Sequence, residues 1–97
     1  MADAVSVAGD HYTVLQENDQ VRILEFRGKP GDKTAMHSHP NIVAIPLSAA
    51  KVKFTGPGGQ SMEIDLGAGQ AMYMDAAEHA TEILGTDDSH VILVELK

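Results

Sequence analysis

The 97-residue sequence contains no cysteine and no tryptophan. Without cysteine, the chain forms no disulfide, has no thiolate nucleophile, and binds neither zinc nor an iron–sulfur cluster through sulfur. Histidine and carboxylate side chains are therefore the only strong metal ligands in the chain. The sequence also lacks the Gly-x-Ser-x-Gly turn of many serine hydrolases, so it gives no sign of a nucleophilic hydrolase.

Basic residues are scarce as well. Seven Lys and Arg stand against 14 Asp and Glu, which gives a formal net charge of −7. Lys51 and Lys53 form the densest basic patch. Nucleic-acid binding requires clustered basic side chains that displace counterions from phosphates, so this function class is excluded.

Long hydrophobic runs are missing, and no segment approaches the ~18 apolar residues that a membrane span needs. The first ten residues, MADAVSVAGD, have no basic stretch followed by an apolar one and so do not resemble a secretory signal. We expect a cytoplasmic protein that has no membrane partner.

The length predicts one domain over residues 1–97, because the chain lies within the usual range for a single domain. A hydrophobic content of 43% is enough to build a core. Residues 1–10 are predicted to form an N-terminal segment that is either flexible or an edge strand.

Turn signals rich in Gly, Pro, Asn and Asp recur at short intervals and leave no space for ordinary helices. Between them lie short runs of β-branched and aliphatic residues. The predicted strands cover residues 11–17, 21–27, 35–39, 42–47, 51–55, 61–66, 70–74, 79–84 and 91–96. Short strands at this spacing are typical of an all-β sandwich or barrel.

Two glycine-rich stretches are interpreted as turns rather than nucleotide-binding loops. Residues 56–59 lack the Gly-Lys-Ser/Thr ending of a phosphate loop and lie between two predicted strands. Residues 67–69 begin like a dinucleotide-binding fingerprint, but Met72 occupies the position of its third glycine.

Residues 91–94, Val-Ile-Leu-Val, are apolar on both faces of their predicted strand. A strand of this kind needs a second covering layer, and in so small an antiparallel protein another subunit can supply it. We therefore predict a homodimer.

The strongest chemical signal is His37-Ser38-His39. Residues i and i+2 of a strand point to the same face, so the two imidazoles can converge on one metal ion. The alternative is a pair of surface histidines in front of Pro40, without a role.

His79 opens a later predicted strand and could deliver a third imidazole from across the sheet. Three nitrogens are enough to hold a divalent ion and leave positions open for a substrate. The remaining two histidines, His11 and His90, match no ligand position and are interpreted as ordinary polar residues.

The sequence resembles the cupin superfamily, in particular its very short single-domain members. Their first motif has a glycine, five residues, His-x-His and a glutamate three or four residues later, and residues 31–39 match its first half. Their second motif has a glycine, five residues, Pro-x-Gly and a histidine. Residues 69–79 are similar to it, with Asp75 for the proline, Ala77 for the glycine and one residue fewer before His79. The resemblance covers residues 21–97.

This resemblance implies an all-β cupin-type jelly-roll β-barrel, the double-stranded β-helix, with His37, His39 and His79 as metal ligands. The family's glutamate ligand would fall at position 43 or 44, where the sequence has Val43 and Ala44. The implied site therefore contains three neutral imidazoles and no carboxylate ligand.

Every second residue of a strand points to the same face. If the strand of the His-x-His motif continues, the side chains that lie beside the site are those of Asn41, Val43, Ile45 and Leu47. We thus expect a barrel wall that is apolar except for Asn41.

Other side chains near the two motifs have two interpretations each. Glu78 either orients a ligand or lies on a solvated strand end. Tyr73, Met36, Met72 and Met74 form either an adaptable substrate pocket or ordinary core, and core is the favoured interpretation.

Two functions follow from these observations. The first is a metal-dependent enzyme, an oxygenase, isomerase or lyase, that acts on a small anionic or enolisable molecule, because three imidazoles leave the charge of a divalent ion uncompensated. The expected metal is a divalent transition metal, one of Fe, Mn, Ni, Cu or Zn. The ligands alone do not identify it, because imidazole suits iron, nickel, copper and zinc alike. The second is a non-catalytic barrel that binds a ligand or metal, or one with a degenerate site.

Overall fold

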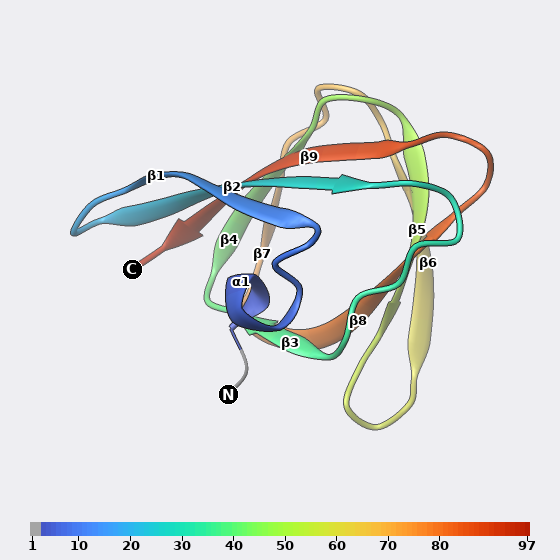
Figure 1. Cartoon of the computed structure of the whole chain (residues 1–97), viewed down its shortest axis with the longest axis horizontal. Coiled ribbons are helices and arrows are strands. Elements are labelled where there is room, and N and C mark those ends of the chain that lie inside the picture. Colours follow the sequence, from blue (N-terminus) through green and yellow to red (C-terminus); the bar gives the residue numbers. More distant parts are fainter. Residues whose placement is uncertain (1–2) are drawn as a thin grey trace.

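The structure is a computed structural model that describes residues 3–97. Within these residues it has nine strands and one short helix (Figure 1). In chain order the elements are α1 (Ala4–Val7), β1 (Tyr12–Glu17), β2 (Val21–Gly28), β3 (His37–His39), β4 (Ile42–Pro46), β5 (Ala50–Thr55), β6 (Ser61–Leu66), β7 (Met72–Met74), β8 (Ala77–Leu84) and β9 (Ser89–Leu96).

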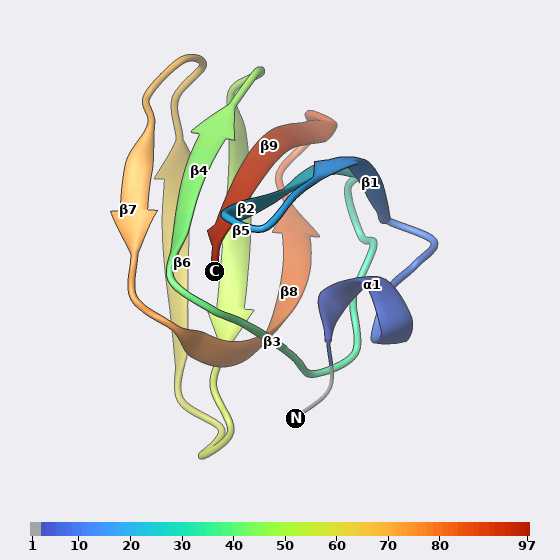
Figure 2. The same cartoon turned by 90° about the vertical axis from the view of Figure 1, so that its left-hand side faces the viewer.

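The strands form two antiparallel sheets. One has five strands in the order β1-β2-β9-β4-β7, and the other has four in the order β3-β8-β5-β6. The two sheets enclose a common interior: Figure 1 shows β4 and β7 on the left and β5 and β6 on the right, and Figure 2 shows β4 and β7 in front of β5 and β6. This is a jelly-roll arrangement, so the all-β prediction is confirmed.

The core lies between the sheets because each strand turns alternate side chains inward. In β8, for example, His79, Thr81 and Ile83 are buried while their neighbours are half-exposed. The largest apolar contributors come from both sheets: Leu24, Phe26, Ile42, Val52, Leu66, Ile83, Val91 and Leu93.

The predicted strands match the observed ones closely, and residues 56–59 form the predicted hairpin turn. Their backbone closes through hydrogen bonds from Gly59 N to Gly56 O at 3.0 Å and from Gly56 N to Gln60 O at 2.8 Å. Gly59 has a φ of 86°, a left-handed conformation that glycine adopts without steric cost. The nucleotide-loop interpretation therefore remains excluded.

The prediction of an edge strand in the N-terminal segment is corrected for residues 3–10, the part of it that the structure describes. Residues 4–7 form helix α1 rather than an edge strand. Asp3 is its N-cap, and its carboxylate accepts hydrogen bonds from Val5 N at 3.2 Å and Ser6 N at 3.3 Å. The helix packs on β1 and β3 and buries Ala4 completely.

The predicted inward phase after His39 is wrong. Ile42, Ala44 and Pro46 are the buried residues of β4, whereas Val43 and Ile45 lie on its outer face. The reason is that β3 and β4 belong to different sheets, so the chain changes sheet at Pro40 and Asn41 and the two-residue period does not carry over. Asn41 and Leu47 are exposed.

Strand β9 is buried on one face and half-exposed on the other, since Val91 and Leu93 point inward while Ile92 and Val94 point outward. The homodimer that would cover the outer face stays a prediction. No helix within residues 3–97 is long and apolar enough to cross a membrane.

Candidate metal centre

Three histidines meet on two neighbouring strands. His37 of β3 lies directly opposite His79 of β8, and His39 follows two residues after His37 on the same face. One ring nitrogen from each residue lies within 4.8 Å of the other two. The side chains are buried, with exposed fractions of 0%, 4% and 9% for His37, His39 and His79. The sequence prediction that these three residues come together is confirmed by the geometry.

The ring of His37 is oriented by its own strand. Its Nδ1 lies 2.8 Å from the carbonyl oxygen of Ala35, which can only accept a hydrogen bond, so Nδ1 carries the proton. The Nε2 lone pair of His37 therefore points into the cluster as a potential metal ligand. Burial lowers the pKa of His37 and favours the neutral imidazole that a metal requires.

His39 is oriented by a carboxylate from the opposite sheet. Its Nδ1 donates to Glu95 Oε2 over 2.8 Å, and the two side chains are only 4% and 3% exposed. This hydrogen bond leaves Nε2 of His39 free for a metal. A buried carboxylate that holds the far nitrogen of a histidine is the arrangement that supports many metal-ligating histidines.

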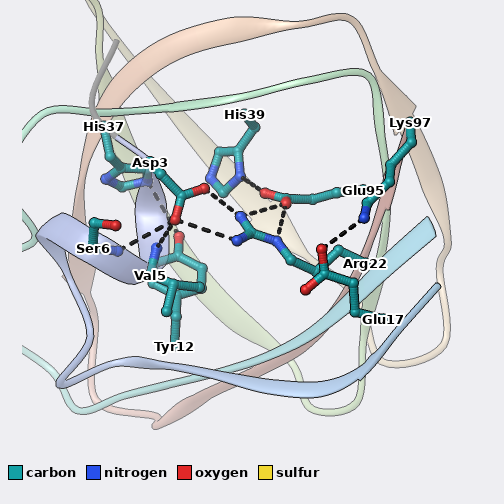
Figure 3. Close-up of polar contacts among 10 residues, drawn as sticks. All are labelled: Asp3, Val5, Ser6, Tyr12, Glu17, Arg22, His37, His39, Glu95 and Lys97. Carbon is teal, nitrogen blue, oxygen red and sulfur yellow. Dashed lines mark hydrogen bonds and ion pairs between the residues drawn. The ribbon is translucent and has the colours of Figure 1, made fainter. Parts of the chain in front are cut away.

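Glu95 belongs to a longer chain of charges, drawn in Figure 3. Arg22 of β2 donates from Nε to Glu95 Oε1 at 2.7 Å. The same guanidinium reaches Asp3 through Nη1 and Nη2. Because Asp3 is also the N-cap of α1, the network His39–Glu95–Arg22–Asp3 ties the histidine cluster to the N-terminal helix.

His79 is held by stacking, and its ring makes no hydrogen bond within residues 3–97. Its ring lies parallel to that of Phe54, with centroids 4.6 Å apart and planes 3° apart. Burial, together with the adjacent His37 and His39, lowers the pKa of His79 to about 3. His79 is thus a neutral imidazole across the physiological range.

The hydroxyl group of Tyr12 contacts the cluster. Its Oη lies 3.3 Å from Nε2 of His37, and because that nitrogen carries a lone pair, the phenol donates. Burial raises the pKa of Tyr12, so the phenol keeps its proton.

A small cavity of about 50 Å³ lies beside the cluster. It has room for about four water molecules, or for a ligand with about the same number of non-hydrogen atoms. The lining is almost wholly apolar apart from the histidines, one phenol and two hydroxyls: Tyr12, Phe26, His39, Ile42, Ala44, Pro46, Val52, Phe54, Leu66, Met72, Met74, His79, Thr81, Ser89, Val91 and Leu93.

The structure is similar to several solved structures. A cupin domain from Bordetella pertussis Tohama I superposes with a TM-score of 0.78 at 27% identity, over 89% of this chain and 91% of that one. An RmlC-like cupin family protein with a double-stranded β-helix fold from Methanocaldococcus jannaschii gives a TM-score of 0.70 at 13% identity, over 88% and 77% of the two chains. This chain has a cupin fold.

A variant of oxalate decarboxylase from B. subtilis has the same fold, with a TM-score of 0.63 at 20% identity over 89% of this chain and 24% of that one. At this identity the similarity concerns the fold alone. By sequence, no family model and no curated protein matches the chain.

At the two positions where the cupin motif has its glutamate ligand, this chain has Val43 and Ala44. Val43 points outward, and Ala44 lines the cavity with a single methyl group. Neither can ligate a metal. The nearest carboxylate is that of Glu95, which contacts His39 from behind instead of joining the ligand set.

The donor set fits a divalent transition metal. Three buried imidazoles lie within reach of one ion, and in His37 and His39 the Nδ1 hydrogen bonds leave Nε2 as the nitrogen with the lone pair. A metal on His37 Nε2 would replace the hydrogen bond that this nitrogen accepts from Tyr12 Oη. Imidazole ligands suit Fe, Ni, Cu and Zn alike, so the donor set does not distinguish among these metals. The metal assignment itself remains a prediction for experiment.

The other residues that the sequence analysis considered for the site lie away from the three histidines. Glu78 is half-buried and pairs with Ser38 on the face opposite to the histidines. Asn41 is exposed, and its side chain accepts a hydrogen bond from Ala76 N at 2.8 Å. Tyr73 is 56% exposed, so its interpretation as core is wrong.

The methionines divide between surface and cavity. Met72 and Met74 are half-buried and line the cavity, whereas Met36 is half-buried elsewhere. Two of the three therefore form part of an adaptable wall rather than core alone.

Sequence reasoning missed Glu95, Arg22 and Tyr12. For Glu95 a signal was present, because it continues the inward series of Val91 and Leu93 in steps of two. A lone carboxylate in such a series indicates a buried, paired charge. No local pattern marks Tyr12, since its contact with His37 spans 25 residues.

Proposed function

We propose that the protein is a metal-dependent cupin that holds a divalent transition metal through His37, His39 and His79 and acts on a small molecule in the adjacent cavity. The observation that carries the proposal is the convergence of three buried ring nitrogens within 4.8 Å, two of them on rings whose other nitrogen is already engaged.

The remaining groups have distinct tasks. A bound divalent ion acts as a Lewis acid toward oxygen atoms of the substrate. Glu95 orients His39, and Phe54 keeps the ring of His79 in place. The phenol of Tyr12 contacts His37, so it would donate a hydrogen bond to a substrate oxygen placed beside the cluster.

Two observations separate an enzyme from a non-catalytic binding barrel. The buried, protonated Tyr12 beside the cluster favours catalysis, since it supplies a donor where negative charge would develop. The lack of a free carboxylate base facing the cavity, within residues 3–97, favours simple binding. We propose the enzyme, with oxygenase, isomerase or lyase chemistry on an enolisable or anionic molecule, as the first hypothesis.

We also propose a homodimer through the outer face of the five-stranded sheet. One register row of this face runs across four strands through Ile23, Val94, Val43 and Tyr73. All four are apolar or aromatic, and Tyr73 is 56% exposed. A contiguous apolar row of this kind is typical of a subunit interface. Light scattering that shows only monomer at micromolar concentration would contradict the dimer.

Turnover tests the proposed function. The chelator-treated protein is reconstituted without oxygen with Fe²⁺, Mn²⁺, Ni²⁺, Cu²⁺ or Zn²⁺ and then assayed for oxygen uptake and product formation with small β-diketones, thiols and hydroxy acids. We expect turnover with at least one metal and its loss in His37→Ala. His11→Ala, a change outside the cluster, is the matched control and keeps activity.

The same experiment can contradict the proposal in two ways. Metal binding without turnover across the panel leaves the non-catalytic barrel as the better account. Failure of every metal to bind indicates a degenerate site.

A further inference from the structure

The strand that carries two of the three histidines has little support from its own sheet. β3 is only three residues long and lies at the edge of the four-stranded sheet, where β8 is its one strand neighbour within residues 3–97. Its register runs from His37 opposite His79 to His39 opposite Ala77. A short edge strand has few hydrogen bonds of its own and opens locally more easily than a central strand. The two ligand residues of β3 therefore depend on support from elsewhere in the chain.

The N-terminal segment covers the other edge of β3. Asp3 forms a parallel β-bridge with Ser38, the residue between the two histidines. Helix α1 starts directly after Asp3, contacts both β1 and β3, and buries Ala4 completely. Figure 2 shows α1 beside these two strands. The ligand strand is thus held between β8 on one edge and the start of the described chain on the other.

The side chain of Asp3 reaches β3 by a second route. Its carboxylate pairs with Nη1 and Nη2 of Arg22. Arg22 donates to Oε1 of Glu95 at 2.7 Å, and the other oxygen of Glu95 accepts the hydrogen bond from His39 at 2.8 Å (Figure 3). Because both oxygens of Glu95 are engaged, the position of the guanidinium fixes the carboxylate that orients the ligand ring.

The planar guanidinium of Arg22 is held by acceptors on two sides. Glu95 binds it from the barrel interior and Asp3 binds it from the N-terminal segment. An arginine fork held by two carboxylates has a defined orientation, which a single acceptor does not give it. Asp3 therefore completes the restraint on Arg22.

We propose that Asp3 is a positioning residue of the metal centre. Its backbone bridge to Ser38 holds the ligand strand in place, and its ion pair with Arg22 holds the orientation of His39 through Glu95. Together the two contacts keep the ligand nitrogens in the geometry that one ion requires, so that little ordering is left for the moment of binding.

The inference deepens the proposed function and rests on it for the metal. The support of β3 is a property of the metal-free protein and can be measured without any ion. The test therefore has one arm without metal and one arm with Zn²⁺, so that failure of this inference and failure of the proposed function give different results.

The principal variant is Asp3→Asn. Asparagine caps a helix about as well as aspartate, and the substitution leaves the backbone bridge in place, so it removes only the charge that faces Arg22. Glu63→Gln is the matched control. It makes the same change of carboxylate to amide at an exposed ion pair with Lys51, at the opposite edge of the same sheet.

The first arm measures amide hydrogen exchange by NMR in the chelator-treated proteins. We expect Asp3→Asn to speed exchange in β3 by roughly three- to tenfold and to leave β5 and β6 unchanged. Glu63→Gln should leave β3 unchanged. A residue that contributes only to overall stability would instead raise exchange in all three strands together.

The second arm measures the rate at which the Zn²⁺-loaded proteins release the ion to an excess of a chromophoric chelator. We expect Asp3→Asn to speed release by roughly three- to tenfold, less than the loss of a direct partner of a ligand causes. The same substitution made in Glu95→Gln should have a smaller effect, because the two residues act on His39 in series.

Three results overturn the inference: unchanged exchange in β3 of Asp3→Asn, an equal rise of exchange in β3, β5 and β6, or Zn²⁺ release from Asp3→Asn at the rate of the wild type. An Asp3→Asn effect on release that is undiminished in Glu95→Gln overturns the route through Arg22. A wild type that binds no Zn²⁺ contradicts the proposed function, and the exchange of β3 then decides whether Asp3 holds the ligand strand.

Discussion

Two histidine–glutamate pairs of equal length occupy very different places in this protein. His39 Nδ1 donates to Glu95 over 2.8 Å in the interior, and His90 Nε2 contacts Glu25 over 2.8 Å at the surface. The first pair is 4% and 3% exposed, and the second is 25% and 24% exposed. Distance alone does not distinguish them.

Burial and the choice of nitrogen separate the two pairs. The inner pair engages Nδ1 of a histidine that clusters with two other imidazoles, so Nε2 of His39 is left for a metal. The outer pair engages Nε2, and His90 belongs to no such cluster within residues 3–97. Low dielectric strengthens the inner hydrogen bond, and solvent screens the outer one. A histidine–carboxylate pair therefore indicates a site only when the ring's other nitrogen faces further ligands.

The largest expected effect comes from the arginine behind the inner pair. Arg22→Met leaves the buried carboxylate of Glu95 without its cation, and removal of one partner of a buried ion pair costs about 3 kcal/mol or more of the free energy of unfolding. Arg27→Met is the matched change at the outer pair, where Arg27 is 67% exposed and contacts Glu25 at 3.3 Å. It should cost less than about 1 kcal/mol. Urea denaturation measures both, and equal losses would remove the distinction.

Acid should destabilise the protein through His79. Because the pKa of His79 falls to about 3 in the folded protein and lies near 6.5 in the unfolded chain, the unfolded state binds the proton first. The stability of the metal-free protein should thus be full above pH 6.5 and fall by about 3 kcal/mol by pH 4. His79→Phe preserves the stacking on Phe54 and should remove most of this loss of stability at acid pH. His90→Phe should leave the loss unchanged. A thermal unfolding series from pH 7 to pH 4 tests this.

Metal affinity gives the next contrast. Glu95→Gln keeps the size of the side chain but removes the charge behind His39, so the dissociation constant for Zn²⁺ should rise by roughly 10- to 100-fold. Glu25→Gln makes the same chemical change at the outer pair and should leave the constant unchanged. Competition with a chromophoric chelator measures both values. The role of Glu95 is refuted if its variant binds as tightly as the wild type.

The smallest effect concerns a buried hydroxyl of β8. Thr81→Val removes a polar atom that has no hydrogen-bond partner within residues 3–97 and should raise the free energy of unfolding by about 1 kcal/mol. Thr13→Val, on the exposed face of β1, should change it by less than about 0.5 kcal/mol. Calorimetry of the two variants tests this, and destabilisation by Thr81→Val would show that its hydroxyl has a partner in the protein.

Much of the fold could be predicted from sequence because strand periodicity and turn residues are local signals. The His-x-His spacing placed His37 and His39 on one face, and the register pairing of His37 with His79 completed the cluster. The prediction of which residues point inward after His39 was wrong, because side chains alternate regularly only within one strand. The chain passes from one sheet to the other at Pro40, between β3 and β4.

The network around the cluster could not be predicted for a different reason. Glu95 reaches His39 across 56 residues, and Arg22 reaches Glu95 across 73. Such contacts depend on which strands become neighbours, which local patterns do not encode. Only the inward phase of Glu95 was visible in the sequence, and it shows where a buried charge lies without showing its partner.

Metal content tests the central claim most directly. The untagged protein, purified without chelators and then given equimolar Zn²⁺, is dialysed and analysed for metal per chain beside two variants, His37→Ala/His39→Ala/His79→Ala and His11→Ala/His90→Ala. We predict about one equivalent of metal in the wild type and in the His11/His90 variant, and less than about a tenth in the inner variant with its fold retained by circular dichroism. Equal metal in all three proteins, or none in the wild type, would contradict the assignment of the buried histidines.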